Sequence, residues 1–418
     1  MSDDTSVLFE AGRIGPVELR NRFVRASTSE GMTDTRGHIT DDLVAMYEGL
    51  ARGGVGLILS GHMFVDRRGQ YDYDQAALDD DAVIPPLQTL TSAAHRHGGK
   101  VFAQLAHAGS QSIVAGNRPL APSPVPNAMT GRDVPGATED DIGETVDAFG
   151  AAARRACEAG FDGVHIHGAN GYLISEFCSP LTNRRTDAWG GSPDARHRFP
   201  VAVARAARAA VPATHAVTFK LGFEDMVPDG GLTLDESVPR AAALVEAGVD
   251  GIEVSCNVMA SYLDNIVPYV AVDRGRAARD WLLHRVVSGA EPPAEGYYRQ
   301  WSRALRDRVE TSVMLVGGLR TTETMSDVVR SGDADFVALS RPFIREPDLV
   351  RQIEGGRRGL VSCTSCNICL MHAGHHPLQC WRTPRRRLLH HAWYRVRGGF
   401  RGGAGSKPEV TSAADPGR

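Results

Sequence analysis

The sequence lacks the features that would place a protein in a membrane or export it. No apolar run approaches the roughly 20 residues needed to cross a bilayer. No basic start precedes an early apolar stretch, so we expect no signal peptide and a cytoplasmic location. An excess of one charge is also missing: 46 Lys and Arg face 50 Asp and Glu, which leaves a formal net charge of -4. This balance argues against a specific nucleic-acid binder.

Cysteine is scarce, and its distribution is uneven. Three of the seven cysteines are scattered, and the other four fall in one C-terminal window: Cys363, Cys366, Cys369 and Cys380. Without a secretion signal, such clustering favours metal binding over disulfides. The spacing Cys-x₂-Cys-x₂-Cys-x₁₀-Cys lets four thiolates surround one compact centre, either zinc or iron–sulfur. A remnant without metal is the third possibility.

Acidic residues are absent from residues 355–408, which contain nine arginines and Lys407. A basic surface beside a metal centre would attract acidic carrier proteins at low salt. The alternatives are a solvated tail or weak attraction to nucleic acid or anionic lipid. Residues 403–418 are polar and rich in Gly, Pro and Ser, so we expect a disordered tail there.

Short apolar runs alternate with longer, alanine-rich helical stretches such as 138–159, 194–210 and 234–247. Strands that alternate with helices pair in parallel, and eight such units fit a closed (β/α)₈ TIM barrel better than an open, doubly wound sheet. The helix over 138–159 should begin with a capping box of Thr138 and Asp141. A hairpin over Leu8–Arg20 should close the barrel bottom. The expected strands are Asn21–Ser27, Gly56–Gly61, Lys100–Ala106, Gly163–Gly168, Ala216–Gly222, Gly251–Cys256, Ser312–Gly318 and Phe336–Arg341.

These assignments divide the chain into a barrel over residues 1–355, a cysteine-cluster and basic extension over 356–402, and the tail. Inside several strands, polar residues alternate with apolar ones, as with His165 and His167 against Val164 and Ile166. Polar groups that point inward near strand C-termini indicate an active-site mouth. Two long connections, 108–137 and 257–296, leave the same ends of strands and should shape a substrate pocket. The second carries aromatic residues and a histidine, namely Tyr262, Tyr269, Trp281 and His284.

One long motif identifies a family. The run His167-Gly168-Ala169-Asn170-Gly171-Tyr172 closely resembles the signature of the old yellow enzyme family, and it is followed by Asn183, Arg185, Thr186, Asp187 and Gly190-Gly191-Ser192. The resemblance continues in Asn21–Val24, Gln104–Gly109, Gly230–Thr233 and Ser340–Phe343, so it spans about residues 5–385. It implies an oxidoreductase with bound FMN.

The resemblance also implies roles for single residues. Gln104 matches the glutamine that hydrogen-bonds the flavin pyrimidine, and Lys220 stands where many members have an arginine near flavin N1. The phosphate is expected at the ends of the last two strands, where glycine N–H groups and an arginine can bind it. The full expected set is Ala26, Ser27, Thr28, Gly61, Gln104, Lys220, Gly317, Gly318, Ser340 and Arg341.

For the substrate, the resemblance implies that His167 and Asn170 bind a carbonyl oxygen and that Tyr172 donates a proton. The leading interpretation is reduction of an activated C=C bond in a small molecule by hydride from flavin N5. The alternatives are an amine dehydrogenase of the trimethylamine dehydrogenase type and a non-enzymatic flavin- or cluster-bearing sensor. Oligomeric state stays open.

The cysteine segment resembles the branch of the family that contains 2,4-dienoyl-CoA reductase and trimethylamine dehydrogenase, whose members hold a 4Fe-4S cluster there. That branch continues with an FAD/NAD(P)-binding region, and this sequence has no clean GxGxxG motif that would begin one. We therefore expect electrons from NAD(P)H directly or from an external carrier, namely a ferredoxin, a flavodoxin or a reductase subunit.

Overall fold

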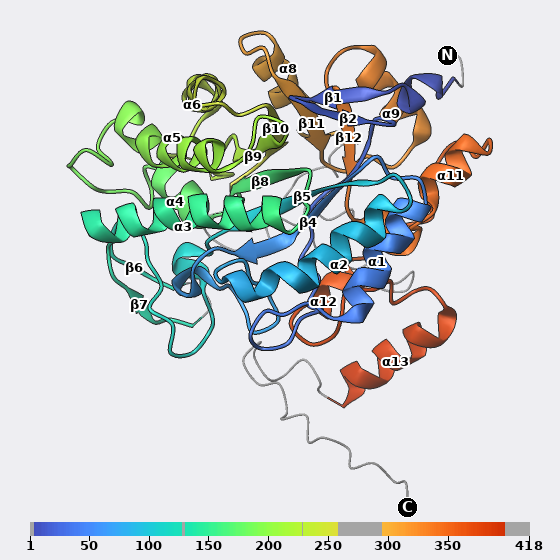
Figure 1. Cartoon of the computed structure of the whole chain (residues 1–418), viewed down its shortest axis with the longest axis horizontal. Coiled ribbons are helices and arrows are strands. Elements are labelled where there is room, and N and C mark those ends of the chain that lie inside the picture. The colour runs from blue at the N-terminus through green and yellow to red at the C-terminus, as the bar shows by residue number, and fades with distance from the viewer. Residues whose placement is uncertain (1–3, 128–129, 228, 258–294, 398–418) are drawn as a thin grey trace, which may run out of the picture.

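The computed structural model describes residues 4–127, 130–227, 229–257 and 295–397. Its centre is a closed barrel of eight parallel strands that neighbour one another in chain order, which excludes the doubly wound alternative (Figure 1). The strands are β3 (Phe23–Arg25), β4 (Leu57–Phe64), β5 (Lys100–Ala106), β8 (Gly163–Gly168), β9 (Ala216–Gly222), β10 (Gly251–Ser255), β11 (Ser312–Val316) and β12 (Phe336–Leu339). Tyr262, Tyr269, Trp281, His284 and the expected tail lie outside the described residues.

Helices cover the outside of the barrel (Figure 1). The longest, α3, begins with the expected capping box: Asp141 N–H donates to Thr138 Oγ1 over 3.1 Å, and Thr138 N–H donates to Asp141 Oδ2 over 2.9 Å. The main barrel helices are α1 (Asp41–Arg52), α2 (Ile84–His95), α3 (Glu139–Glu158), α5 (Pro193–Ala210), α6 (Leu234–Glu246), α8 (Arg299–Arg306), α9 (Thr322–Arg330) and α11 (Leu349–Glu354). No helix in these ranges is long and apolar enough to cross a membrane.

Two apolar layers hold the barrel together. The larger lies between strands and helices, and it includes Val164 and Ile166 of β8. The smaller fills the inside of the barrel near its bottom, where the hairpin of β1 (Gly12–Ile14) and β2 (Val17–Leu19) packs against inward residues such as Phe102 and Phe336. The predicted hairpin is therefore confirmed, and it keeps water out of one end of the barrel.

Above this apolar layer, the inward side chains become polar. Gln104 and Thr218 are 1% and 0% exposed, and each lies two residues further along its strand than an apolar residue of that layer, Phe102 or Ala216. Because alternate residues of a strand face the same side, these groups point into the barrel toward its C-terminal mouth. Burying polar groups is unfavourable unless they are hydrogen-bonded, so this layer marks a functional end.

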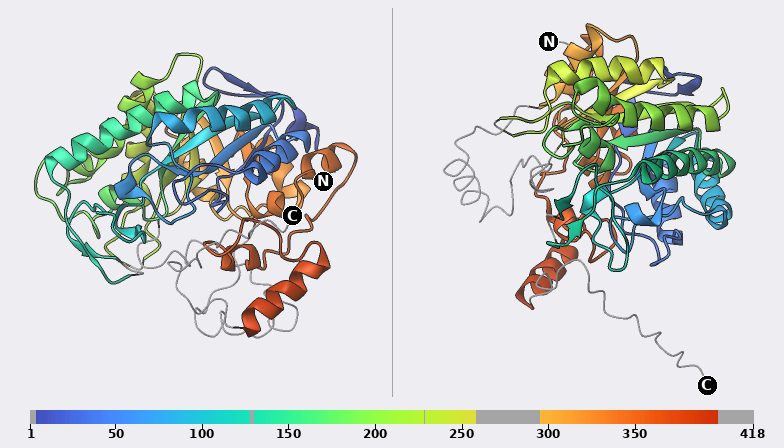
Figure 2. Two further views of the ribbon diagram at one scale, coloured as in Figure 1. Left: turned by 60° about the horizontal axis from the view of Figure 1, so that its bottom comes forward. Right: turned by 90° about the vertical axis from the view of Figure 1, so that its left-hand side faces the viewer.

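The C-terminal segment folds back over the mouth. Leu378 N–H donates to Glu30 O over 2.9 Å, and Thr321 forms a bridge with Leu360. Two short elements follow β12: α10 (Arg341–Arg345) and α12 (Ile368–Met371). The last helix, α13 (Arg385–Val396), stands out from the barrel (Figures 1 and 2).

Candidate active site

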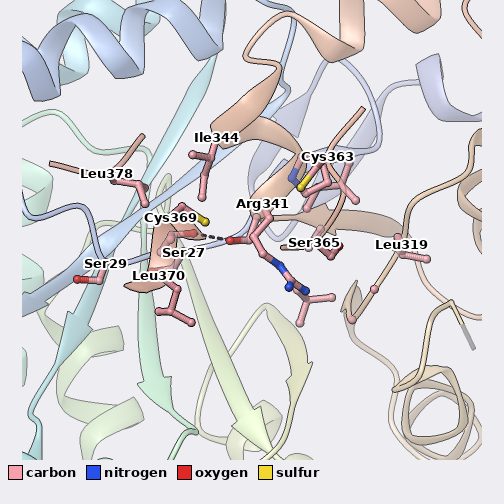
Figure 3. Close-up of a pocket in the computed structure, with 18 of the residues that line it drawn as sticks. Ser27, Ser29, Leu319, Arg341, Ile344, Cys363, Ser365, Cys369, Leu370 and Leu378 are labelled. Atoms are coloured by element: carbon pink, nitrogen blue, oxygen red, sulfur yellow. Dashed lines mark hydrogen bonds between the residues drawn. The ribbon is translucent and has the colours of Figure 1, made fainter. Parts of the chain in front are cut away.

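A cavity of about 300 Å³ opens at the C-terminal ends of the strands. Figure 3 shows that Cys363, Cys369 and Arg341 line the same cavity as Ser27. Most of the residues that the sequence assigned to FMN or substrate line it, namely Ser27, Thr28, Asn170, Lys220, Gly317, Gly318, Ser340 and Arg341. A volume of this size and a position at the mouth of a barrel are typical of a cofactor or ligand site.

Gln104 lies directly behind this wall. Its Oε1 accepts a hydrogen bond from Ser27 Oγ over 2.6 Å, which orients the side-chain amide. Its Nε2 is buried and has no partner among the described residues. Gln104 itself does not line the cavity, but buried amide donors are rarely left unsatisfied, so Nε2 is a candidate donor to a ligand bound there.

Ala26 and Gly61 support the wall from behind. Ala26 N–H donates to Leu339 O over 2.9 Å, and its own carbonyl accepts from Thr28 Oγ1 over 3.2 Å. A Cβ on Gly61 would come within 2.6 Å of Glu30 Oε2. Glycine is therefore needed for the close packing of β4 against the segment after β3, while Gly61 itself does not line the cavity.

The end of β11 forms a glycine turn beside two arginines. Gly317 and Gly318 have φ values of 128° and 70°, which side chains rarely adopt. Arg341 donates from Nη1 to Asn367 Oδ1 over 2.5 Å, and Arg320, which the sequence analysis missed, donates from Nη2 to Cys363 O over 3.1 Å. This corner of the cavity carries two positive charges and suits an anion such as a phosphate.

His167 and Tyr172 lie side by side, with ring centroids 4.9 Å apart. Burial, helped by the charge of Lys220, holds the pKa of His167 well below 6.5, so the imidazole is neutral at neutral pH. His167 Nδ1 is buried without a partner in the described ranges. Burial raises the pKa of Tyr172 well above 10, so its hydroxyl keeps its proton.

His62 and Tyr71 complete an aromatic group around Tyr172, and each ring centroid lies 5.7 Å from that of Tyr172. The sequence analysis missed both residues. They belong to β4 and the connection after it, far from the His167–Tyr172 motif in the chain, and neither stands in a motif of its own.

Asn170 occupies a left-handed turn with φ of 63°. Its backbone N–H donates to Cys256 O over 3.1 Å, and its Oδ1 lies 3.4 Å from the Ser255 hydroxyl. The expected loop 108–137 contributes Gln111, whose Nε2 donates to Asn170 O over 3.1 Å and to Gly171 O over 2.6 Å. The turn is therefore held from two sides, with the Asn170 side chain at the cavity wall.

Lys220 is bonded from below by a buried carboxylate that the sequence analysis did not single out. Lys220 Nζ and His165 Nε2 lie 2.9 and 3.0 Å from Glu253 Oε2. His165 Nδ1 lies 2.8 Å from Thr218 Oγ1, which gives His165 the partners that its sequence context left unexplained. Burial alone would raise the pKa of Glu253, but the charge of Lys220 and the hydrogen bond from His165 outweigh it and hold the pKa at about 2.

The four clustered cysteines line a second, smaller cavity together with Arg341, Asn367 and Trp381. None of the four is in a disulfide. Cys363 and Cys369 also line the larger cavity, so the two cavities share a wall. Across the described ranges, no three His, Cys, Asp or Glu side chains are arranged to hold one metal ion. The choice between iron–sulfur, zinc and no metal therefore stays a prediction.

Comparison with known proteins agrees with this geometry. Residues 7–359 match the NADH:flavin oxidoreductase / NADH oxidase family. The chain is 36% identical over 366 residues to an NADH oxidase of Thermoanaerobacter brockii, covering 86% of this chain and 53% of that protein. It is 33% identical over 379 residues to a 4,4'-dithiodibutanoate disulfide reductase of Rhodococcus erythropolis, covering 88% of this chain and 93% of that protein.

Among solved structures, the histamine dehydrogenase from Rhizobium sp. 4-9 superposes with a TM-score of 0.76 at 26% identity, covering 92% of this chain and 53% of that one. The chain thus spans about half the length of the NADH oxidase and of the histamine dehydrogenase. With the family match over most of the barrel, the resemblance to the old yellow enzymes is confirmed, and the protein belongs to the NADH:flavin oxidoreductase / NADH oxidase family.

Proposed function

We propose that the protein is an FMN-dependent oxidoreductase that reduces an activated carbon–carbon double bond of a small molecule. The observation that carries this proposal is a pair of unsatisfied polar atoms, Gln104 Nε2 and His167 Nδ1, both buried at the barrel mouth without a partner in the described chain. Leaving such a group unsatisfied costs about 1–3 kcal/mol, so a cofactor and a substrate that bond them would be strongly favoured.

The residues around the cavity fit FMN. Gln104 offers an amide to the pyrimidine edge, and Lys220 offers a positive charge beside it. Gly317, Ser340 and Arg341 surround the corner that suits the phosphate. When bound, FMN would supply the hydride that adds to the substrate.

The protein's own side chains would then stabilise the negative charge that develops on the substrate and supply the proton. His167 and Asn170 would hold the substrate oxygen, where negative charge grows as the double bond is reduced. Tyr172, protonated at neutral pH, would give its proton to the neighbouring carbon. A neutral His167 suits this role, because it donates a hydrogen bond without carrying a charge of its own.

A second function, oxidation of an amine, is favoured by one observation. The rings of His62, Tyr71, His167 and Tyr172 gather at one place, and aromatic faces attract cations such as a substituted ammonium. The fold of this chain also resembles that of a histamine dehydrogenase. Reduction leads because His167 Nδ1, which has no partner among the described residues, suits a substrate oxygen.

One experiment separates the two functions. Protein loaded with FMN is reduced anaerobically and mixed with a cyclic enone, while oxidised protein is mixed with a tertiary amine; flavin absorbance is followed in both. We expect rapid reoxidation by the enone, slowed in Tyr172→Phe, and no reduction by the amine. Reduction by the amine without reoxidation by the enone would establish the alternative, and rapid reoxidation by the enone would exclude a mere sensor.

We further propose that Cys363, Cys366, Cys369 and Cys380 hold a 4Fe-4S cluster. Support comes from the cavity that all four line and from the wall it shares with the larger one. Zinc, with Zn–S bonds of about 2.3 Å, needs four sulfurs packed tightly around one ion. A 4Fe-4S cluster has a larger core than a single zinc ion, so its four cysteine sulfurs stand further apart. Such a cluster would carry single electrons between the flavin cavity and a ferredoxin, a flavodoxin or a reductase subunit, with NAD(P)H as the other donor.

A further inference from the structure

The buried layer below the cavity contains a carboxylate with an unequal set of partners. Glu253 is 0% exposed. Its Oε2 receives both Lys220 Nζ and His165 Nε2, while its Oε1 has no partner in the described part of the chain. An ionised group in such a place is stable only with a cation beside it. Lys220 is that cation, and it lines the cavity.

The hydrogen positions in this layer follow from its chemistry. Glu253 can only accept, so His165 carries a hydrogen on Nε2. Burial lowers the pKa of His165, so the ring is neutral at neutral pH, and its Nδ1 lies 2.8 Å from the Thr218 hydroxyl, whose single hydrogen it shares with Val164 O. That hydroxyl also lies 3.0 Å from Val164 O. Among the described residues, Lys220 is therefore the cation in contact with the Glu253 carboxylate.

Other cations at the cavity are engaged elsewhere. Arg320 bonds Cys363 O, and Arg341 bonds Asn367 Oδ1. Arg25 does not line the cavity, and it pairs with Glu30, which does, at 2.9 Å. Of the cations that line the cavity, Lys220 is thus the one that pairs with the buried carboxylate of Glu253, which opposes its field in the cavity.

We propose that Glu253 is the counter-charge that sets how strongly Lys220 stabilises negative charge in the cavity, and that His165 and Thr218 hold Glu253 in position. The inference rests on the proposed function, because the charge in question is the one a bound flavin gains on two-electron reduction. Glu253 is a positioning residue: it acts through Lys220. In a low-dielectric layer, removing its charge should strengthen the field of Lys220 considerably.

The test is the reduction potential of bound FMN in Glu253→Gln, Lys220→Met and the double variant, measured by anaerobic redox titration. Glutamine keeps the size and the acceptor of Glu253. We expect Glu253→Gln to shift the equilibrium toward reduced flavin by about tenfold or more, which is about 30 mV for a two-electron couple. Lys220→Met should shift it the opposite way, and the double variant should lie between the two.

Glu176→Gln is the matched control. Glu176 is also a buried glutamate, but it bonds Ser110 rather than a cation and does not line the cavity, so its variant should keep the wild-type potential. If Glu253→Gln does not fold, Thr218→Val tests the same series of hydrogen bonds, because Thr218 contacts His165 and His165 contacts Glu253. This variant should shift the potential in the same direction as Glu253→Gln, by a smaller amount.

The outcomes are distinguishable. Variants that bind FMN with an unchanged potential, or with Glu253→Gln and Lys220→Met shifted in the same direction, would overturn the counter-charge while leaving the proposed function intact. Failure of the wild-type protein to bind FMN would instead overturn the proposed function, and the inference with it.

Discussion

The pKa values of two buried glutamates in the barrel, neither of which lines the cavity, are shifted in opposite directions by their neighbours. Glu253 has a lysine beside it, and its pKa is held at about 2. Glu176, in α4 (Leu173–Cys178), has no cation among its partners, and burial raises its pKa to about 8 despite hydrogen bonds from Ser110. The residue type is the same, so the difference comes from the charge of the neighbour.

Glu176 should make stability depend on pH. The unfolded chain releases this proton near pH 4.5 and the folded chain near pH 8. The contribution of Glu176 is therefore complete below pH 4.5 and is lost as pH rises through 8. Glu176→Gln should raise the free energy of unfolding by about 1–3 kcal/mol at pH 8 and leave it nearly unchanged at pH 4.5. Urea denaturation at both pH values measures this, and an equal change at both would refute it.

Tyr172 should matter for turnover but not for FMN binding. Tyr172→Phe removes the proposed proton donor and should slow enone reduction about 10²–10⁴-fold. Because the pKa of Tyr172 lies well above 10, wild-type turnover should not lose its proton donor between pH 6 and 9. Steady-state rates across that range and FMN titration of both proteins test this. Weakened FMN binding in the variant would assign Tyr172 to cofactor packing instead.

At the scale of elements, most strands follow from the sequence, and their ends depend on tertiary pairing. The bounds of β5, β8 and β9 are those expected from apolar runs. The first expected strand begins too early, because Asn21 Oδ1 accepts from Phe23 N–H and this local bond replaces a ladder bond. Strand β11 ends before Gly317 because the positive φ values there leave the sheet. Strand β4 runs on to Phe64 because it pairs with β5 again after an irregularity.

The same reasoning explains which site residues could be found. His167, Asn170 and Tyr172 stand in one contiguous motif, so the sequence showed them together. Glu253 lies on the next strand, β10, and meets Lys220 only when β9 and β10 pair. His62 reaches Tyr172 in the same way. No local spacing in the sequence records such contacts between strands.

The capping box of α3 gives a prediction at this scale. Thr138→Ala removes the side chain that accepts from Asp141 N–H and should lower the free energy of unfolding by about 1 kcal/mol. Asp147→Ala, at an exposed position of the same helix, should cause no loss because alanine favours helix. Urea denaturation compares the two variants, and equal losses would show that the cap contributes nothing specific.

At the scale of the whole molecule, the residues that line the cysteine cavity end at Arg382, shortly before helix α13, which projects from the barrel (Figure 2). The exposed face of α13 carries Arg385, Arg386 and Trp393, and His391 of the same helix bonds His372 over 2.9 Å. A basic face close to the proposed cluster suits an acidic carrier protein.

Turnover driven by an acidic ferredoxin should therefore fall steeply as salt rises from about 50 to 300 mM, because exposed charges are screened over a Debye length of about 10 Å at 0.1 M. Turnover driven by NADH should change little and serves as the control. Turnover with ferredoxin that is independent of salt would contradict docking at this surface.

The most direct test of the account is an ultraviolet–visible spectrum of anaerobically purified protein, with iron and acid-labile sulfide measured on the same sample. We expect flavin bands together with about four irons and four sulfides per chain. Flavin with zinc or without metal would remove the cluster from the account and leave an ene-reductase supplied by NAD(P)H. Absence of flavin from protein supplied with FMN would contradict the central claim.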